Sequence, residues 1–225
     1  MIYSCVKPGI FLERPNRFIA RCEMEGVVHV CHVKNTGRCK ELLVPGATVF
    51  LSKASNPNRA TQYDLIGVQK GPRLINMDSQ APNQLFREWA ISGGIPGLTL
   101  IKPEVFFGSS RFDFYLEAEG QKTFVEVKGV TLERDGLVLF PDAPTERGVR
   151  HVQELCRCVS EGYAAIIVFM IQMDNVRCFT PNDATHPAFG NALRAAREQG
   201  VRLLALDCHV TPESIEARNP VEIQL

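Results

Sequence analysis

Alternating apolar and polar residues fill the first third of the chain, in short runs closed by Gly, Pro or Asn. A period of two is typical of strands that bury one face. The pattern predicts an all-β segment over residues 10–78. Its five expected strands are residues 18–22, 27–33, 48–52, 63–68 and 73–76.

The segment from Asn35 to Leu43 interrupts this alternation and is followed by Pro45-Gly46. We expect one turn of helix here, ended by the Pro-Gly pair. Asn35-Thr36-Gly37 itself predicts a backbone turn, because Asn and Gly tolerate positive φ angles. Five short strands with one helical insert are typical of a small barrel of the OB type, a common platform for single-stranded nucleic acid.

Near residue 80 the apolar period changes to that of a helix, which predicts two domains, residues 1–80 and 81–225. Residues 80–92 form the first expected helix, with Leu85 and Trp89 on one side and Gly93-Gly94 at its end. A strand over 99–107 follows.

Further elements are expected beyond residue 140. A helix ends near Glu161, with an inner face of apolar residues that begins at Val149. The continuous apolar run 163–171 predicts a strand covered on both faces. The remaining expected elements are a helix at 187–199, a strand at 201–207, a short helix opened by Thr211-Pro212 and a last strand at 221–225.

Residues 110–131 predict two strands joined by a polar turn at Glu119-Gly120-Gln121. In the second strand Glu126 and Lys128 share one face, opposite Val125 and Val127, because strand side chains repeat every two residues. This hairpin carries the clearest candidate chemistry in the chain.

The register of the hairpin decides whether Asp113 joins that face. A two-residue loop at Glu119-Gly120 sets Asp113 opposite Glu126, and one at Gly120-Gln121 sets it opposite Lys128. A regular three-residue loop would send Asp113 to the other face. The first two registers are favoured, since the phenylalanines of the first strand and the valines of the second then line one core.

Asp113, Glu126 and Lys128 are the candidate catalytic residues. Carboxylate oxygens suit Mg²⁺ or Mn²⁺, and a neighbouring lysine can orient a water or offset developing charge. Asp113 and Glu126 are candidate metal ligands, Glu104 is the candidate third ligand, and Glu88 is a further candidate for the cleft. A single Glu-x-Lys triplet arises by chance in a chain of this composition, so the interpretation depends on the hairpin.

The chain is neutral overall, but residues 1–80 carry 11 Lys and Arg against 6 Asp and Glu. A basic first domain suits a polyanion, and the acidic remainder suits a divalent metal. We expect this domain to bind nucleic acid mainly through phosphates, because few aromatic residues are available for stacking. The candidate residues are Arg14, Arg17, Arg21, Lys34, Arg38 and Lys40.

No apolar run approaches the ~20 residues of a membrane span, and the longest runs only from Ala164 to Ile171. The amino terminus lacks a signal-peptide pattern, so we expect no membrane partner. The 8 cysteines have no C-x-x-C spacing and predict reduced core thiols in a cytoplasmic protein.

Asp113 followed by Glu126-Val127-Lys128 resembles the PD-(D/E)xK nuclease superfamily, with Phe112 in place of the superfamily's proline. The expected element order α-β-β-β-α-β-α-β is similar to the restriction-endonuclease-like core. We therefore predict an α/β (α+β) chain. It has an amino-terminal OB-like β-barrel followed by a restriction-endonuclease-like mixed sheet flanked by helices.

The chain as a whole resembles the sugar fermentation stimulation protein A family. The matching segments are Pro15-Asn16-Arg17-Phe18, Asn35-Thr36-Gly37, Arg111-Phe112-Asp113-Phe114, Glu126-Val127-Lys128, Phe140-Pro141-Asp142-Ala143 and Thr145-Glu146-Arg147-Gly148 with His151. The resemblance implies DNA binding and a regulatory role in sugar (maltose) metabolism. It assigns Asp113 and Glu126 to the metal, gives Lys128 the lysine role, and places Arg147 and His151 at the same cleft.

Two functions from different classes are consistent with these features. One is a Mg²⁺-dependent phosphodiesterase acting on DNA or RNA, which the joint presence of Asp113, Glu126 and Lys128 favours. The other is a DNA-binding regulator in which the nuclease fold is only a scaffold. The sequence has no helix-turn-helix pattern, which argues against a conventional repressor. It makes no prediction about oligomeric state.

Overall fold

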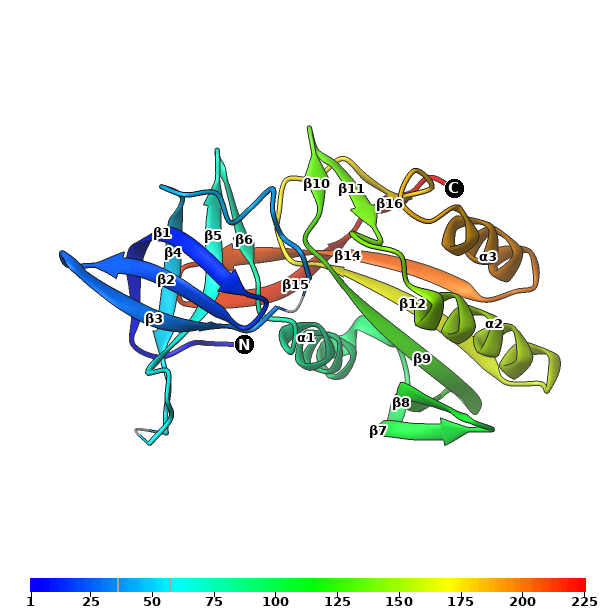
Figure 1. Cartoon of the computed structure of the whole chain (residues 1–225). Coiled ribbons are helices and arrows are strands. Elements are labelled where there is room, and N and C mark those ends of the chain that lie inside the picture. The colour runs from blue at the N-terminus through cyan, green and yellow to red at the C-terminus, as the bar shows by residue number, and fades with distance from the viewer. Residues whose placement is uncertain (36, 57) are drawn as a thin grey trace.

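The computed structural model describes residues 1–35, 37–56 and 58–225 of the 225-residue chain. Thr36, the middle residue of the expected Asn35-Thr36-Gly37 turn, lies outside the described residues, as does Pro57. A barrel of strands and a helix-flanked mixed sheet lie side by side (Figure 1).

The amino-terminal barrel is a sheet with the strand order β3-β2-β1-β4-β5-β6. A parallel pairing between β3 and β5 closes five of the strands into a barrel, and β6 extends it. The expected OB-like barrel is therefore confirmed. The strands are β1 (Val6–Asn16), β2 (Ile19–Met24), β3 (Val27–Val33), β4 (Thr48–Lys53), β5 (Tyr63–Lys70) and β6 (Arg73–Asn76).

One strand of the barrel differs from the sequence prediction. The first strand, β1, was missed because Pro8, Gly9 and Pro15 disturb its alternation, yet it pairs with both β2 and β4. The single helical turn expected before Pro45-Gly46 is present and does not continue into a helix. Its N–H donors at Leu42 and Leu43 share the carbonyl of Cys39, at 3.2 and 2.9 Å.

The carboxy-terminal sheet has the order β15-β14-β12-β9-β8-β7. Its central strands β9, β12 and β14 are parallel, and the strands outside them are antiparallel. This is the expected mixed sheet. Its strands are β7 (Leu98–Phe107), β8 (Ser110–Ala118), β9 (Gln121–Val130), β12 (Ala164–Ile171), β14 (Arg202–Thr211) and β15 (Ser214–Pro220).

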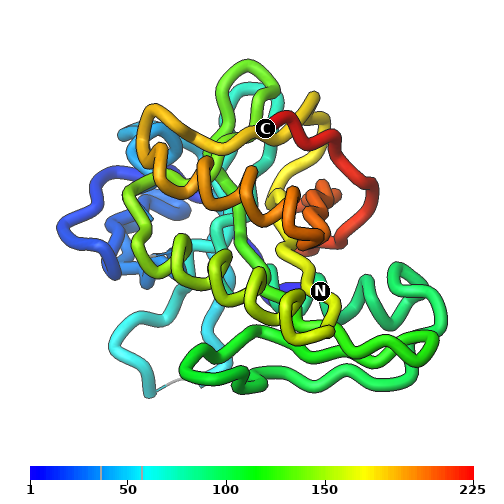
Figure 2. Tube along the Cα trace, turned by 90° about the vertical axis from the view of Figure 1, so that its right-hand side faces the viewer, coloured from blue at the N-terminus to red at the C-terminus, as the bar shows by residue number. Residues whose placement is uncertain are grey.

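Helices cover both faces of this sheet. The helix α1 (Ala81–Trp89), which continues as the π-helical turn η1 (Ala90–Gly94), packs on one face over β9, β12 and β15. The helices α2 (Glu146–Ser160) and α3 (Pro187–Glu198) lie side by side on the other face (Figure 2). Thr145 caps α2, since its hydroxyl accepts a hydrogen bond from the Gly148 N–H at 3.1 Å.

A third, smaller sheet was not expected. It has the order β10-β11-β13-β16 and comprises β10 (Glu133–Arg134), β11 (Leu137–Phe140), β13 (Cys178–Pro181) and β16 (Glu222–Ile223). The short helix predicted at Thr211-Pro212 is wrong. Pro212 lies instead in the turn between the antiparallel strands β14 and β15, where its fixed φ and missing N–H are tolerated.

Buried polar contacts fix the two domains to each other. Glu133 pairs with Lys70 and Arg73 of the barrel, at 2.8 and 3.1 Å. The amide of Gln172 donates to the Asn76 side chain and to the Asp78 carbonyl, both at 2.9 Å. The strand β10 and the residue after β12 (Ala164–Ile171) are thus held against the barrel.

All 8 cysteines are free, and most are buried, as expected of core thiols. No helix in the described part of the chain is both long and apolar enough to cross a membrane.

Candidate metal and nucleic-acid site

The hairpin between β8 and β9 has the first of the three possible registers. Ala118 pairs with Gln121, so the loop is Glu119-Gly120, and both loop residues have positive φ angles of 50° and 78°. This two-residue loop matches the twist of the flanking strands. The ladder ends at the Phe114–Val125 pair, and one further step along the two strands leads to Asp113 and Glu126.

The regular alternation of β8 ends just before Asp113. Phe114 contacts Phe86 of α1 with ring centroids 5.3 Å apart, as expected for the α1 side of the sheet. Phe112 instead contacts Phe124 and His151 on the α2 side, at 5.6 and 6.2 Å. Phe114 therefore shares a core with Val125 and Val127, as predicted, but Phe112 lies in the other core.

Asp113 is held by two hydrogen bonds at this irregular position. Its Oδ2 accepts from the main-chain N–H of Val127 at 2.8 Å, and its Oδ1 accepts from Asn83 Nδ2 of α1 at 2.9 Å. The first bond ties the carboxylate to the middle residue of the Glu126-Val127-Lys128 triplet. Asn83 was missed by the sequence analysis, since its only signal was its place near the start of a helix.

Glu126 is 3% exposed and is surrounded by positively polarised groups. Its Oε1 accepts a hydrogen bond from Lys128 Nζ at 2.5 Å and is also bonded to Nδ1 of His151. Its buried Oε2 has no hydrogen-bond partner within the described part of the chain. A buried carboxylate oxygen without a partner is costly, so this atom is available to a ligand.

The two carboxyl groups differ in acidity. Burial of Asp113, and then the nearby Glu126 carboxylate, raise the pKa of Asp113 above its ordinary value. Burial would also raise the pKa of Glu126, but the hydrogen bonds and charges of His151 and Lys128 outweigh it and lower that pKa. The pKa values of the two carboxyl groups are thus shifted in opposite directions.

The helix α2 brings His151 into contact with Glu126 and with Arg147. Arg147 Nε donates a hydrogen bond to His151 Nε2 at 3.4 Å. Nε2 is therefore an acceptor, which leaves the proton on Nδ1 for the bond to Glu126. The direct contact between His151 and Glu126 had no sequence signal beyond the shared motif.

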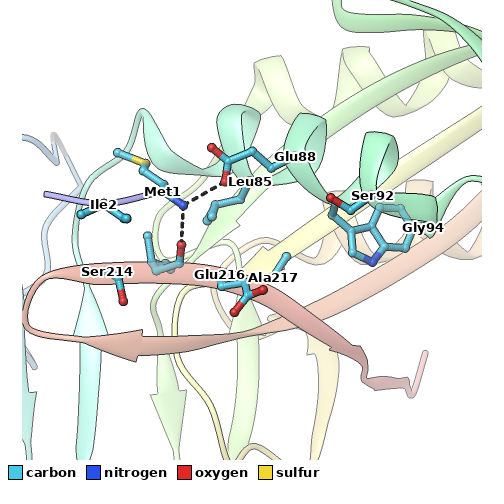
Figure 3. Close-up of a pocket in the computed structure, with 11 residues that line it drawn as sticks. Met1, Ile2, Leu85, Glu88, Ser92, Gly94, Ser214, Glu216 and Ala217 are labelled. Carbon is cyan, nitrogen blue, oxygen red and sulfur yellow. Dashed lines mark hydrogen bonds and ion pairs between the residues drawn. The ribbon is translucent and has the colours of Figure 1, made fainter.

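The other two candidate carboxylates are not brought to Asp113 and Glu126. The backbone of Glu104 lies opposite Asp113 between two β7–β8 pairs, but its side chain is 66% exposed and pairs with Arg111 at 3.4 Å. Glu88 lies on the far side of α1, where its carboxylate accepts from the Met1 amino group at 2.9 Å (Figure 3). In residues 1–35, 37–56 and 58–225, no three His, Cys, Asp or Glu side chains form a metal-binding cluster.

The six candidate basic residues of the first domain have unequal freedom to bind a ligand. The Arg14 guanidinium is already hydrogen-bonded within the protein, because it donates to the carbonyls of Asn35 and Gly37, among others, at 2.7 and 2.9 Å. Lys34 pairs with the buried Asp78 at 2.6 Å. The remaining four, Arg17, Arg21, Arg38 and Lys40, are exposed, although Arg21 also pairs with Glu13 at 2.6 Å.

Two family models match adjacent parts of the chain. One, described as the SfsA N-terminal OB domain, matches residues 12–77, and the other, described as the sugar fermentation stimulation protein RE domain, matches residues 80–214. The chain belongs to the sugar fermentation stimulation protein family. The family expected from the sequence motifs is confirmed.

Similarity to members of this family extends over the whole chain. A sugar fermentation stimulation protein homolog of Desulfitobacterium hafniense is 60% identical, with 100% of this chain and 99% of that protein covered. One of Ruminiclostridium cellulolyticum is 55% identical, with 100% of both covered. The solved structure of Pyrococcus furiosus SfsA in complex with Ca²⁺ is 30% identical, with a TM-score of 0.90 over 100% of this chain and 98% of that one.

Proposed function

We propose that the carboxy-terminal domain binds Mg²⁺ or Mn²⁺ through Asp113 and Glu126 and hydrolyses phosphodiester bonds of DNA. The observation that carries the proposal is the closeness of Asp113 and Lys128 to Glu126, whose buried Oε2 has no hydrogen-bond partner in the described part of the chain. A scaffold without chemistry has no need of this costly arrangement.

The donor set fits such a cation. Mg²⁺ is commonly held by one or two carboxylates and keeps several waters, so a third protein ligand is not required. A bound cation also relieves the repulsion between Asp113 and Glu126 that raises the pKa of Asp113. The related Pyrococcus furiosus protein was solved in complex with Ca²⁺, another cation that prefers oxygen ligands, which supports a divalent-cation site in this family.

In this proposal the protein's own residues divide the work. When bound, the cation supplies Lewis acidity and lowers the pKa of a water. Lys128 places its ammonium beside Glu126, where it can orient the attacking water or offset negative charge that grows on the phosphate. Val127 and Asn83 fix the direction of the Asp113 carboxylate.

The barrel would hold the DNA. Arg17, Arg38 and Lys40 are exposed on this basic domain and suit contacts to phosphates. Arg17 also lies over the ring of Phe18, 4.6 Å from its centroid, so one exposed aromatic residue accompanies the charges. Binding through phosphates alone weakens steeply with salt and shows little sequence preference.

The test is hydrolysis of labelled single- and double-stranded DNA and RNA with Mg²⁺ or Mn²⁺. Lys128→Ala should slow cleavage ~10²-fold or more while Mn²⁺ affinity changes much less, because the lysine acts on the reacting groups. Asp113→Asn should abolish both cleavage and metal binding. Lys122→Ala, on the same strand but exposed near the opposite end, is the matched control and should leave the rate unchanged.

Two results would overturn the proposal. Equal activity in all four preparations would identify a contaminating nuclease. A wild-type protein that binds DNA but cuts nothing would favour the alternative function, a DNA-binding regulator of sugar metabolism in which the nuclease fold is only a scaffold.

A further inference from the structure

A pocket of about 460 Å³ lies beside the carboxylates, between the β7–β8 turn and the first two turns of α2. Arg147, Arg150 and His151 line it from the helix, and Ser109 and Ser110 line it from the turn. Its volume is in the range of small-ligand pockets. The mechanism proposed above makes no use of it.

The charge of this pocket is positive and poorly compensated. In the described residues no carboxylate lies within ion-pairing distance of Arg147 or Arg150. Glu154 also lines the pocket, but both of its oxygens accept from Arg157 at 3.1 Å. The carboxylate that could neutralise the two arginines is thus already paired.

Two guanidinium groups three residues apart lie on one face of a helix and repel each other. An anion between them removes that repulsion, and guanidinium groups match the oxygens of phosphate in two parallel hydrogen bonds. The hydroxyls of Ser109 and Ser110 add neutral donors at the opposite wall. The donor set therefore selects a phosphate group.

A single imidazole ring connects this pocket to the carboxylates. His151 accepts from Arg147 through Nε2, at 3.4 Å, and contacts Glu126 through Nδ1. A phosphate held by Arg147 would therefore lie one side chain away from the atoms that bind the metal. A nucleic-acid strand carries its phosphates at short, regular intervals, so one strand can reach both places.

We infer that this pocket binds a phosphate of the nucleic-acid strand next to the phosphate at Asp113 and Glu126, with Arg147 and Arg150 as its contacts. The inference rests on the proposed function for the identity of the ligand. It adds a subsite that fixes the position of the strand relative to the carboxylates.

The experiment measures binding without cleavage. Fluorescence anisotropy with short 3′-labelled oligonucleotides in EDTA reports affinity in the absence of divalent ions. Arg150→Gln should weaken binding roughly tenfold, which is the effect of one charge-assisted hydrogen bond. It should also lower the slope of log affinity against log salt concentration by about 1, the value for one phosphate contact. Arg150 is exposed, so its replacement leaves the core intact.

Arg197→Gln is the matched control, because Arg197 is an exposed arginine in the last turn of α3 and does not line the pocket. It should bind like the wild type. An equal loss for both variants would mean that the strand contacts only a general basic surface, and no loss for Arg150→Gln would exclude the pocket. Either result overturns the inference.

Oligonucleotides with a 5′-phosphate and with a 5′-hydroxyl identify the source of the phosphate. A preference for the 5′-phosphate that Arg150→Gln abolishes indicates a terminal phosphate, and an equal loss on both indicates an internal phosphodiester. The proposed function is judged separately, by hydrolysis with Mg²⁺ or Mn²⁺. If the protein does not cleave DNA, the binding measured in EDTA still tests the pocket. If Arg150→Gln does not weaken binding, the hydrolysis assay still tests the proposed function.

Discussion

His151 of α2 hydrogen-bonds through Nδ1 to Glu126 of β9, a residue 25 positions earlier in the chain. The contact makes α2 part of the candidate metal site, although no carboxylate comes from that helix. Groups that orient a metal ligand in this way affect affinity almost as strongly as the ligands do.

Replacing His151 should weaken Mn²⁺ binding while the protein stays folded. His151→Ala removes a donor from Glu126 Oε1, and we expect affinity to fall about tenfold or more by titration calorimetry. His151→Asn, whose amide can reach the place of Nδ1, should recover part of the loss.

His186→Ala provides the control for this prediction. His186 is as buried as His151, at 8% exposed, but it lies at the start of α3 and pairs with Glu146 at 3.1 Å. The His186→Ala variant should have a lower melting temperature than the wild type and an unchanged Mn²⁺ affinity. If both histidine variants lose the same affinity, His151 acts only through general stability.

The pH dependence of metal binding should follow Asp113. Because the pKa of Asp113 is raised by burial and by Glu126, its proton persists to a higher pH than on an ordinary aspartate. Mn²⁺ must displace that proton, so affinity should rise with pH through the raised pKa and then level off. The same shift makes the metal-free fold less stable as pH rises through that pKa.

Calorimetry with Mn²⁺ from about pH 4 to 8 tests this dependence, since the range begins just above the ordinary aspartate pKa and covers values raised from it. Double-stranded DNA is omitted so that only the metal is titrated. An affinity that is already level just above the ordinary aspartate pKa would contradict the prediction.

The sequence was informative where a function depends on local geometry. The two-residue repeat of side chains along β9 predicted that Glu126 and Lys128 share a face. The polar turn restricted the register of Asp113 to three possibilities. Glu119 and Gly120 at positive φ then selected one of them. A β-hairpin is a local structure, so its sequence carries most of the information needed.

The sequence was uninformative where the site depends on tertiary packing. Asn83 meets Asp113 only because α1 lies over β9, and His151 meets Glu126 only because α2 covers the opposite face. Neither distance along the chain nor periodicity specifies such contacts. Likewise, the pairing of β1 with two neighbouring strands overrides the poor strand propensity of its prolines and glycine.

Arg14 should be a determinant of stability rather than of DNA affinity. Its guanidinium donates to the carbonyls of Arg17, Asn35, Gly37 and Arg38 at 2.7–2.9 Å, which a lysine cannot reproduce. Arg14→Lys should therefore lower the free energy of unfolding by roughly 2 kcal/mol, measured by urea denaturation.

Arg17→Lys is the comparison, because Arg17 is exposed and keeps its charge in this variant. Its unfolding free energy should stay within ~0.5 kcal/mol of the wild type. The prediction about Arg14 fails if the two variants are equally stable.

Glu133 should make the junction between the domains sensitive to acid. It is buried at 2% exposure and bonded to Lys70, Arg73 and the Gly136 N–H. Burial would raise the pKa of Glu133, but Lys70, the Gly136 N–H and Arg73 outweigh it and lower the pKa. Stability from this carboxylate is therefore present above its unfolded value of 4.5 and is lost as pH falls through the lower folded value.

Glu133→Gln should lower the free energy of unfolding at neutral pH by about 3 kcal/mol, the low end for breaking a buried ion pair, since Lys70 and Arg73 are partly exposed. The difference from the wild type should begin to shrink as pH falls below the unfolded pKa, and it should be smallest below the lower folded pKa, where both side chains are neutral. Urea denaturation at neutral and acidic pH measures this difference.

Glu216→Gln is the control, at a glutamate whose side chain is 70% exposed. Its difference from the wild type should not change with pH, because that carboxylate gains little from its partner. A Glu133→Gln difference that stays constant across this range would mean that the amide loses packing rather than charge, and that the ionised carboxylate does not hold the domains together.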